Sequence, residues 1–319
     1  MRGIRVGTPG GSEAMEYLEF ETPKPGPSEA LVRVEAAGVN FIDVYHRTGL
    51  YPLPTPFTPG SEGAGVVEAV GSGVTEVREG DRVAFFHIGA YAEKNLVPAA
   101  KLVPIPQGID TKTAAAALLQ GATAHYLTTS TFPLGGGEKV LVHAAAGGVG
   151  GILVQMCKRR EAYVFGTAST SKLAMVREAG ADVVIDYTSA DFEQEVLGAT
   201  DGVGLDVVYD SVGQSTFDGS FNCVKQRGML VMFGQSSGPV PPFDILRLSK
   251  KSIFLTRPTL GHYVGDPNEL LWRARELFDA IASGVVQIRV DRELPLSEAG
   301  EAHRLLEGRK TVGKLLLIP

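Results

Sequence analysis

The segment HAAAGGVGGILVQMCKRR, from His143 to Arg160, joins a short β-branched run to a helical apolar pattern through small residues. Ala145, Gly147 and Gly150 have the spacing of the G-x-G-x-x-G fingerprint, with alanine in the first place. There the first small residue permits a tight turn, the second lets the backbone approach a diphosphate, and the third lets helix pack on strand. A glycine turn can also pack a helix on a sheet without any ligand. The strand before it and the helix after it favour a dinucleotide site.

The next turn, GTASTSK from Gly166 to Lys172, indicates which dinucleotide is bound. An NAD enzyme places Asp or Glu near this point to hold the ribose 2′-hydroxyl. This segment has no acid and instead offers hydroxyls and a cation, on Thr167, Ser169, Thr170, Ser171 and Lys172. Such donors and a positive charge suit a 2′-phosphate, which favours NADPH. Ser169 or Thr170 could also cap the following helix, but capping alone leaves the missing acid unexplained.

The pattern after residue 111 predicts the frame that positions both turns. An alanine-rich helical stretch is followed by six short β-branched runs, most of them separated by helical patterns: KVLVHAA, AYVFGT, DVVIDY, LDVVYDSVG, RGMLVMFG and SIFLT. Alternation of strand and helix is typical of an α/β domain with a doubly wound parallel sheet, the Rossmann fold.

The first hundred residues alternate with period two and predict a small, mostly antiparallel β domain. The strand-like runs cover residues 30–39, 63–74, 80–86 and 89–98. Residues 47–60, RTGLYPLPTPFTPG, contain four prolines and predict an irregular loop of the kind that lines sites. The last fifty residues predict two helices and a closing strand, which we place back on the first domain. The predicted catalytic domain is therefore discontinuous, 1–120 and 260–319, and the dinucleotide-binding domain covers 121–259.

Composition excludes several classes of function. The chain has 319 residues, 44% of them hydrophobic, and a net charge of -6 without a basic stripe. This balance disfavours nucleic acid and anionic membranes as partners. Cys157 and Cys223 have no CxxC companion, so neither a disulfide framework nor a cysteine zinc site is expected. With no signal-peptide pattern and no long apolar run, we expect a cytoplasmic protein.

Eight motifs stand in an order and at separations that resemble one known family almost end to end. They are AAGVNFIDVYHRTGLYP, PGSEGAGVV, GDRV, GAYAE, AAAGGVG, VVYDSVG, FGQSS and TRPTL. The family is the zinc-free quinone oxidoreductase branch of the medium-chain dehydrogenase/reductase superfamily, the group that includes ζ-crystallin. The resemblance implies a GroES-like, β-rich catalytic domain built from both ends of the chain around a Rossmann domain. It also implies NADPH in the cleft between them and a homodimer joined through Rossmann edge strands.

The resemblance also implies roles for single residues. Gly147, Gly148 and Val149 match the diphosphate turn, and Ser169 and Lys172 match the 2′-phosphate pocket, with Thr170 beside them and Tyr187 near the adenosine. The other implied cofactor and substrate contacts are Asn40, Tyr45, Tyr126, Ser211, Phe233, Gly234, Ser236, Ser237, Thr256, Arg257 and Arg309. One departure is that GTASTSK is a residue shorter than in some relatives, which leaves open which of its hydroxyls meets the phosphate.

Zinc-dependent relatives carry a cysteine near the position of Asn40, a Gly-His-Glu at 60–62 and a four-cysteine lobe. This chain has Gly60-Ser61-Glu62 and lacks those thiols and that histidine. A zinc site needs about four closely held N or S ligands, which the scattered histidines would have to supply unaided. We therefore expect no metal.

Without a metal, the chemistry should rest on placing the nicotinamide hydride against an electrophilic acceptor. Tyr45 and Tyr51 are candidates to stack on or hydrogen-bond the acceptor, and Asn40 to orient it, although ordinary loop packing also accounts for Tyr51. The predicted function is NADPH-dependent quinone reduction. Two alternatives stay open: an NADPH-dependent reductase of α,β-unsaturated carbonyls, and an NADPH-binding structural protein with little turnover.

Overall fold

A computed structural model describes all residues, 1–319, and the chain divides into two compact units. Unit 1 comprises Met1–Ala122, Asp266–Gly284 and Ile288–Pro319, and unit 2 comprises Thr123–Gly265 and Val285–Gln287. The sequence places the corresponding boundaries after residue 120 and before residue 260. Unit 1 is therefore discontinuous along the chain.

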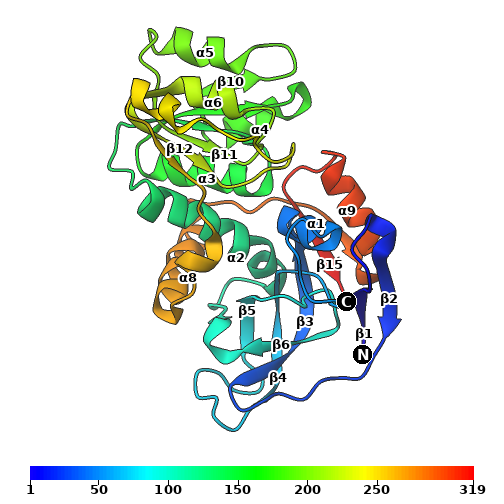
Figure 1. The fold of residues 1–319 in the computed structure, drawn as a ribbon. Coiled ribbons are helices and arrows are strands. Elements are labelled where there is room, and N and C mark those ends of the chain that lie inside the picture. The colour runs from blue at the N-terminus through cyan, green and yellow to red at the C-terminus, as the bar shows by residue number, and fades with distance from the viewer. The chain divides into compact units, whose positions relative to one another are not determined.

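Unit 2 is built on a six-stranded sheet in the order β10-β9-β8-β11-β12-β13, in which every neighbouring pair is parallel. Figure 1 labels β10, β11 and β12 of this sheet. Its strands are β8 (Lys139–Val142), β9 (Tyr163–Ala168), β10 (Val183–Asp186), β11 (Leu205–Asp210), β12 (Val224–Met232) and β13 (Phe254–Thr256). Numbered within the unit, this order is 3-2-1-4-5-6, the order of the Rossmann fold. The predicted doubly wound sheet is confirmed.

Consecutive apolar residues form these strands because both faces of the sheet are covered. In β9, five successive residues from Val164 to Ala168 are buried, where a sheet with one wet face would alternate. Helices α5 (Phe192–Ala199) and α6 (Phe217–Cys223) pack on one face, where Val196 and Phe221 join Leu141 and Phe165 in one apolar cluster. The other helices of the unit are α3 (Gly148–Arg159), α4 (Leu173–Glu178) and α7 (Leu260–Tyr263).

Unit 1 contains a seven-stranded sheet with β3 near its centre. The order is β14-β15-β3-β4-β5-β7, with β6 also paired to β3, and a separate hairpin joins β1 to β2. The strands are β1 (Arg2–Val6), β2 (Met15–Glu19), β3 (Glu29–Val39), β4 (Glu62–Val70), β5 (Arg82–Phe86), β6 (Lys94–Pro98), β7 (Leu102–Pro104), β14 (Val290–Pro295) and β15 (Lys314–Ile318). Antiparallel pairing of β15 with β3 returns the end of the chain to its beginning.

Helices α1 (Phe41–Thr48), α2 (Thr111–Tyr126), α8 (Pro267–Ala282) and α9 (Ala299–Glu307) complete this part of the chain. The last residues of α2 belong to unit 2. Helices α2 and α8 pack so closely that a Cβ at Gly121 would overlap the methyl groups of Leu277. Glycine inside a helix costs about 1 kcal/mol relative to alanine, so it marks this close approach. None of the helices has both the length and the apolar character that crossing a bilayer requires.

Several strands of unit 1 differ from the pattern-based expectation. The runs at 63–74 and 89–98 are strands only over Glu62–Val70 and Lys94–Pro98, because turns occupy the remainder, including Gly89 at φ +104°. Strands β1, β2, β7 and β14 are unpredicted. In β2, four of the five residues are exposed and there is no apolar alternation to predict a strand.

Candidate functional site

The candidate cofactor residues follow the strands of unit 2 one after another. Because all six strands are parallel, their carboxyl ends share one edge, where ligands of doubly wound sheets bind. After β8, β9, β10, β11, β12 and β13 come, respectively, Gly147–Val149, Ser169–Lys172, Tyr187, Ser211, Phe233–Ser237 and Arg257, and Thr256 is the last residue of β13. The structure therefore brings the dinucleotide half of the predicted site to one sheet edge.

The glycine turn has space beside its backbone. Ala144 adopts φ +49°, and its carbonyl accepts the Gly147 N–H at 2.8 Å. A Cβ at Gly150 would overlap the Ala144 carbonyl, so the fold itself requires that glycine. A Cβ at Gly147 would meet only that carbonyl, at 3.1 Å. Gly147 is the N-cap of α3, whose first N–H groups lack helical acceptors, and this open space fits a diphosphate.

The segment predicted to hold the 2′-phosphate contains a carboxylate contact that sequence reasoning missed. Ser169 begins a short 3₁₀ turn without a side-chain capping bond, so helix capping does not explain its hydroxyl. The Thr170 hydroxyl donates to Asp186 at 2.5 Å. Hydrogen bonds from Thr170 and Thr188 lower the pKa of Asp186, so it is ionised at neutral pH. Asp186 is the last residue of β10, the third strand of unit 2. The dinucleotide motifs read from the sequence concern the turns after the first two strands, so they do not point to this residue. Thr170 as a cofactor contact stays a prediction, with its proton directed at this carboxylate.

The loops after β11, β12 and β13 interlock at the same edge. A Cβ at Gly234 would lie 2.5 Å from the Ser211 carbonyl, so only glycine allows this approach. The Ser237 N–H donates to the Val212 carbonyl at 2.8 Å, and Arg257 Nη1 donates to a carbonyl at the end of β12 at 2.8 Å. These contacts fix several of the residues that the resemblance implies as cofactor and substrate contacts.

Tyr126 is 2% exposed and stacks on Tyr263, with ring centroids 4.1 Å apart and an interplanar angle of 7°. The Tyr263 hydroxyl accepts a hydrogen bond from Thr131 at 3.1 Å. One face of Tyr126, predicted as a cofactor or substrate contact, is therefore covered by protein. No sequence motif pointed to Tyr263.

In unit 1, a buried ion pair fixes the Asn40 side chain. Its amide nitrogen donates to Glu62 Oε1 at 2.8 Å, and its oxygen accepts from Lys314 Nζ at 2.8 Å and from Gln120 at 3.2 Å. Lys314 and Glu62 also pair directly, with side chains 1% and 0% exposed. Burial lowers the pKa of Lys314, and the adjacent carboxylate opposes that shift. Neither Lys314 nor Glu62 was predicted to contact Asn40, although Glu62 lies in the motif PGSEGAGVV.

The positions that hold zinc ligands in zinc-dependent relatives are occupied by a hydrogen-bonded network. Ser61 Oγ donates to Asp43 Oδ1 at 2.6 Å, and the Tyr91 hydroxyl donates to Asp43 Oδ2 at 3.1 Å. Burial raises the pKa of Asp43 to about 6. No three His, Cys, Asp or Glu side chains gather in a way that could hold a metal ion. An amide, a hydroxyl and a lysine-paired carboxylate do not make the donor set that zinc takes.

Tyr45 and Tyr51 form an aromatic pair at the end of α1 and the start of the proline-rich loop. Their ring centroids are 5.1 Å apart with an edge-on angle of 61°, and the Tyr51 N–H donates to the Tyr45 carbonyl at 3.0 Å. Both rings are half-buried. Arg309 follows α9 with φ +56°. Unit 1 thus carries the predicted acceptor residues and Arg309, whereas the dinucleotide residues belong to unit 2.

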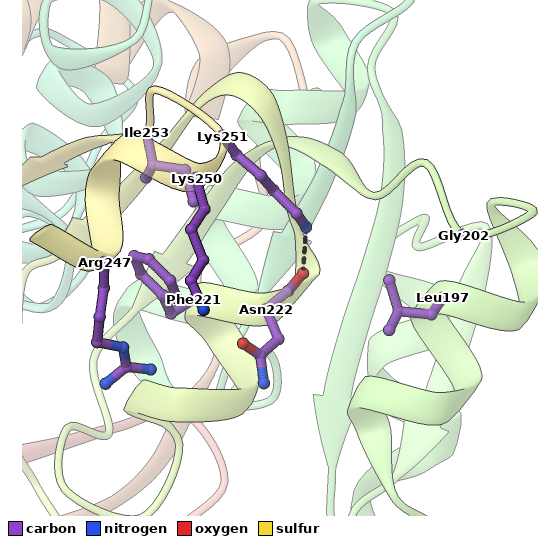
Figure 2. Close-up of a pocket in the computed structure, with 8 residues that line it drawn as sticks. All are labelled: Leu197, Gly202, Phe221, Asn222, Arg247, Lys250, Lys251 and Ile253. Carbon is purple, nitrogen blue, oxygen red and sulfur yellow. Dashed lines mark hydrogen bonds between the residues drawn. The ribbon is translucent and has the colours of Figure 1, made fainter.

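A cavity of about 360 Å³ in unit 2 lies at the opposite edge of the sheet, where strands begin (Figure 2). It is lined by Leu197, Gly202, Phe221, Asn222, Arg247, Lys250, Lys251 and Ile253. Lys251 Nζ donates to the Asn222 and Val224 carbonyls at the end of α6, both at 2.9 Å, and Arg247 pairs with Asp218. Two of its cations therefore stabilise the fold, and no predicted site residue lines it.

A Rossmann sheet with ligand-binding loops at its carboxyl edge, joined to a discontinuous β-rich unit, defines a medium-chain dehydrogenase/reductase. Two family models match: the alcohol dehydrogenase GroES-like domain over residues 26–107 and the zinc-binding dehydrogenase over residues 179–317. The quinone oxidoreductase of Pseudomonas aeruginosa is 46% identical over 99% of both chains. The chain belongs to the ζ-crystallin-like quinone oxidoreductase family of this superfamily.

Two further relatives bear on the chemistry. The crystal structure of Escherichia coli quinone oxidoreductase complexed with NADPH matches with a TM-score of 0.98, at 40% identity and full coverage of both chains. A 2-haloacrylate reductase from a Burkholderia species is 39% identical over 97% of this chain and 96% of its own.

The geometry of the glycine turn separates a packing role from a binding role. Gly150→Ala should lower the free energy of unfolding by about 1–3 kcal/mol, because its methyl overlaps the Ala144 carbonyl. Gly147→Val should leave the fold intact and abolish NADPH binding, because its γ-methyls fill the diphosphate space. Gly151→Ala, whose Cβ lies 3.7 Å from its nearest neighbour, should change neither. Thermal unfolding and NADPH fluorescence titration measure the two effects, and unchanged affinity in Gly147→Val would contradict the assignment.

The hydroxyl and lysine segment predicts selectivity for NADPH. Lys172→Glu should weaken NADPH binding about ten- to a hundredfold more than NADH binding, because a charged hydrogen bond to the 2′-phosphate is lost. Lys250→Glu makes the same charge change at the opposite sheet edge and serves as the control. Dissociation constants for both cofactors check the result, and equal losses in Lys172→Glu would refute it.

Proposed function

We propose that this chain is an NADPH-dependent quinone reductase that transfers hydride to small quinones without a metal. The observation that carries the proposal is the unbroken set of dinucleotide positions at the carboxyl edge of six parallel strands, with space beside Gly147. It is supported by full-length similarity to proteins named quinone oxidoreductase, one solved with NADPH.

Unit 2 supplies the binding half of the mechanism. The first N–H groups of α3 and the positive end of its dipole attract the diphosphate, and Ser169 and Lys172 receive the 2′-phosphate. Interlocked loops around Ser211 and Gly234 restrict the orientation of the nicotinamide. When bound, NADPH supplies the hydride. What the protein contributes is proximity and orientation, which can account for several kcal/mol of the barrier.

Unit 1 supplies the acceptor half, and we assign the catalytic domain to residues 1–120 and 260–319. Tyr45 and Tyr51 offer ring faces and hydroxyls to a planar acceptor. Asn40 is rigid, because Lys314, Glu62 and Gln120 fix its amide. A quinone is already electrophilic and needs no Lewis acid, so positioning suffices and solvent can supply the proton.

A second function is favoured by one comparison. The relative named 2-haloacrylate reductase shares the whole length of the chain, and such an acceptor is an electron-poor alkene. Reduction of α,β-unsaturated carbonyls by NADPH would use the same dinucleotide half with a different acceptor surface. An NADPH-binding structural protein with little turnover is the third candidate, and turnover itself distinguishes it.

The substrate proposal predicts a defined activity profile. Purified protein should oxidise NADPH with small ortho- or para-quinones, retain that activity in a chelator, contain no stoichiometric zinc and leave ethanol with NADP unchanged. Tyr45→Phe should lower kcat by roughly 10–100-fold if its hydroxyl orients the acceptor. Gly147→Val is the background control. Chelator-sensitive alcohol oxidation with bound zinc would overturn the proposal, and fast enone turnover without quinone turnover would establish the alternative.

We also propose that the protein forms a homodimer through the β13 edge of unit 2. Strand β13 ends the sheet, and its Phe254 and Leu255 are 59% and 36% exposed. Ile245 and Leu246, in the turn before it, are 73% and 71% exposed. An apolar unpaired edge strand favours pairing with a second copy. The cytoplasmic location, predicted from the sequence without a signal-peptide pattern or a long apolar run, stays a prediction that cell fractionation tests.

Light scattering after size exclusion should give twice the 33.8 kDa of the chain. Phe254→Lys should produce monomers, because a charge on the edge strand disfavours strand pairing. Val203→Lys, at a 64% exposed position away from that edge, should remain dimeric. A monomeric wild type, or dimers of unchanged stability in Phe254→Lys, would refute this interface.

A further inference from the structure

Four buried polar side chains form a continuous chain of hydrogen bonds at the carboxyl ends of β8, β9 and β11. His143 Nδ1 lies 3.0 Å from Thr167 Oγ1, and His143 Nε2 lies 3.0 Å from Ser220 Oγ. Ser220 Oγ lies 2.7 Å from Asp210 Oδ2. All four residues are at most 2% exposed. We call this set the His143 relay.

The chemistry of the relay assigns every proton. The Asp210 carboxylate can only accept, so Ser220 donates its hydroxyl proton to it and accepts from His143 Nε2–H. Burial lowers the pKa of His143 and keeps the imidazole neutral, with a single N–H. His143 Nδ1 is therefore an acceptor, and Thr167 must donate to it, so the Thr167 hydroxyl is not among those left to meet a 2′-phosphate. All three hydrogen bonds point in one direction, from β9 to Asp210.

Both ends of the relay hold loops of the dinucleotide site. At one end, the Thr167 carbonyl accepts the Ala145 N–H at 2.9 Å, within the glycine turn. Thr167 also precedes Ser169 by two residues. At the other end, Asp210 Oδ1 accepts the N–H groups of Val212 and Gly213 at 2.7 and 3.0 Å, which fixes the loop after β11.

The middle of the relay also touches the glycine turn. His143 directly precedes Ala144, whose φ of +49° is unfavourable for a residue with a Cβ and persists only where the surroundings hold it. The Phe192 ring packs edge-on against the imidazole at 4.7 Å and shields it. Removing one member therefore leaves a buried group unpaired, which raises the free energy of this loop arrangement.

We propose that Thr167, His143, Ser220 and Asp210 act as one positioning unit. This unit fixes the three loops that follow β8, β9 and β11 before the cofactor binds. The ligand named here rests on the proposed function. The four residues are positioning residues, since they act through the loops and not on the reacting atoms. Preformed loops lower the ordering cost of binding, so the relay governs NADPH affinity rather than the hydride step.

Isosteric variants test this without emptying the core. Thr167→Val and Ser220→Ala should each weaken NADPH binding about five- to tenfold and leave kcat at saturating NADPH within about twofold. The double variant should lose less than the product of the two, because both break the same relay. Thr167→Ser keeps the hydroxyl and should restore affinity. Thr200→Val is the matched control, a buried threonine of the same unit that bonds the Val196 carbonyl at 2.8 Å.

Hydrogen exchange of the cofactor-free protein gives a second readout. In Thr167→Val, protection should fall at the Val212 and Gly213 amides, at the far end of the relay, and Thr200→Val should leave them unchanged. Exchange changes confined to β9, or NADPH affinity equal to wild type despite a lower Tm, would overturn the proposal. If wild type itself fails to bind NADPH, the proposed function is wrong, and the exchange measurement still decides whether the relay couples the loops.

Discussion

Parallel pairing of β8 with β9 on one side and β11 on the other is the constraint on which the dinucleotide half depends. It places the turns that follow β8, β9 and β11 side by side at one edge, and backbone hydrogen bonds hold part of that edge. The Ala145 N–H reaches the Thr167 carbonyl, and the His143 N–H reaches the Tyr209 carbonyl. Side chains add selectivity and order to an edge whose position the sheet has already set.

The β-rich unit depends on a different constraint, the return of β15 to β3. That pairing brings Lys314 beside Glu62 and Asn40, which come from the far end of the chain. A buried carboxylate and a buried ammonium are costly alone, so each requires the other. This ion pair in turn fixes the side-chain amide of Asn40, which would otherwise rotate. In the same unit, Ser61 stands where zinc-dependent relatives carry a histidine, and its hydroxyl donates to Asp43, which Tyr91 also contacts.

Sequence reasoning captured the features that have a period or a fixed spacing. Apolar runs predicted the six parallel strands, and the spacing of Ala145, Gly147 and Gly150 located the turn before α3. It missed partners that only the fold brings together. Asp186 reaches Thr170 across neighbouring strands, and Lys314 reaches Glu62 across 252 residues. Neither contact has a local signal, because the pairing partner is set by sheet order and not by neighbouring residues. Exposed strands such as β2 escaped for another reason, since they lack a buried face to impose alternation.

The separation of Glu62 and Lys314 has a consequence for synthesis of the chain. The lysine is made 252 residues after the carboxylate it neutralises, roughly 10–50 s later at usual translation rates. Until then, β3 and β4 can pair, but their apolar interior would enclose an uncompensated negative charge. Nearly all residues of unit 2 lie between positions 123 and 265, so it does not wait for a partner from the end of the chain and can fold first. In the nascent chain, unit 2 would thus be folded while Asn40 still lacks the Lys314 ammonium that orients its amide.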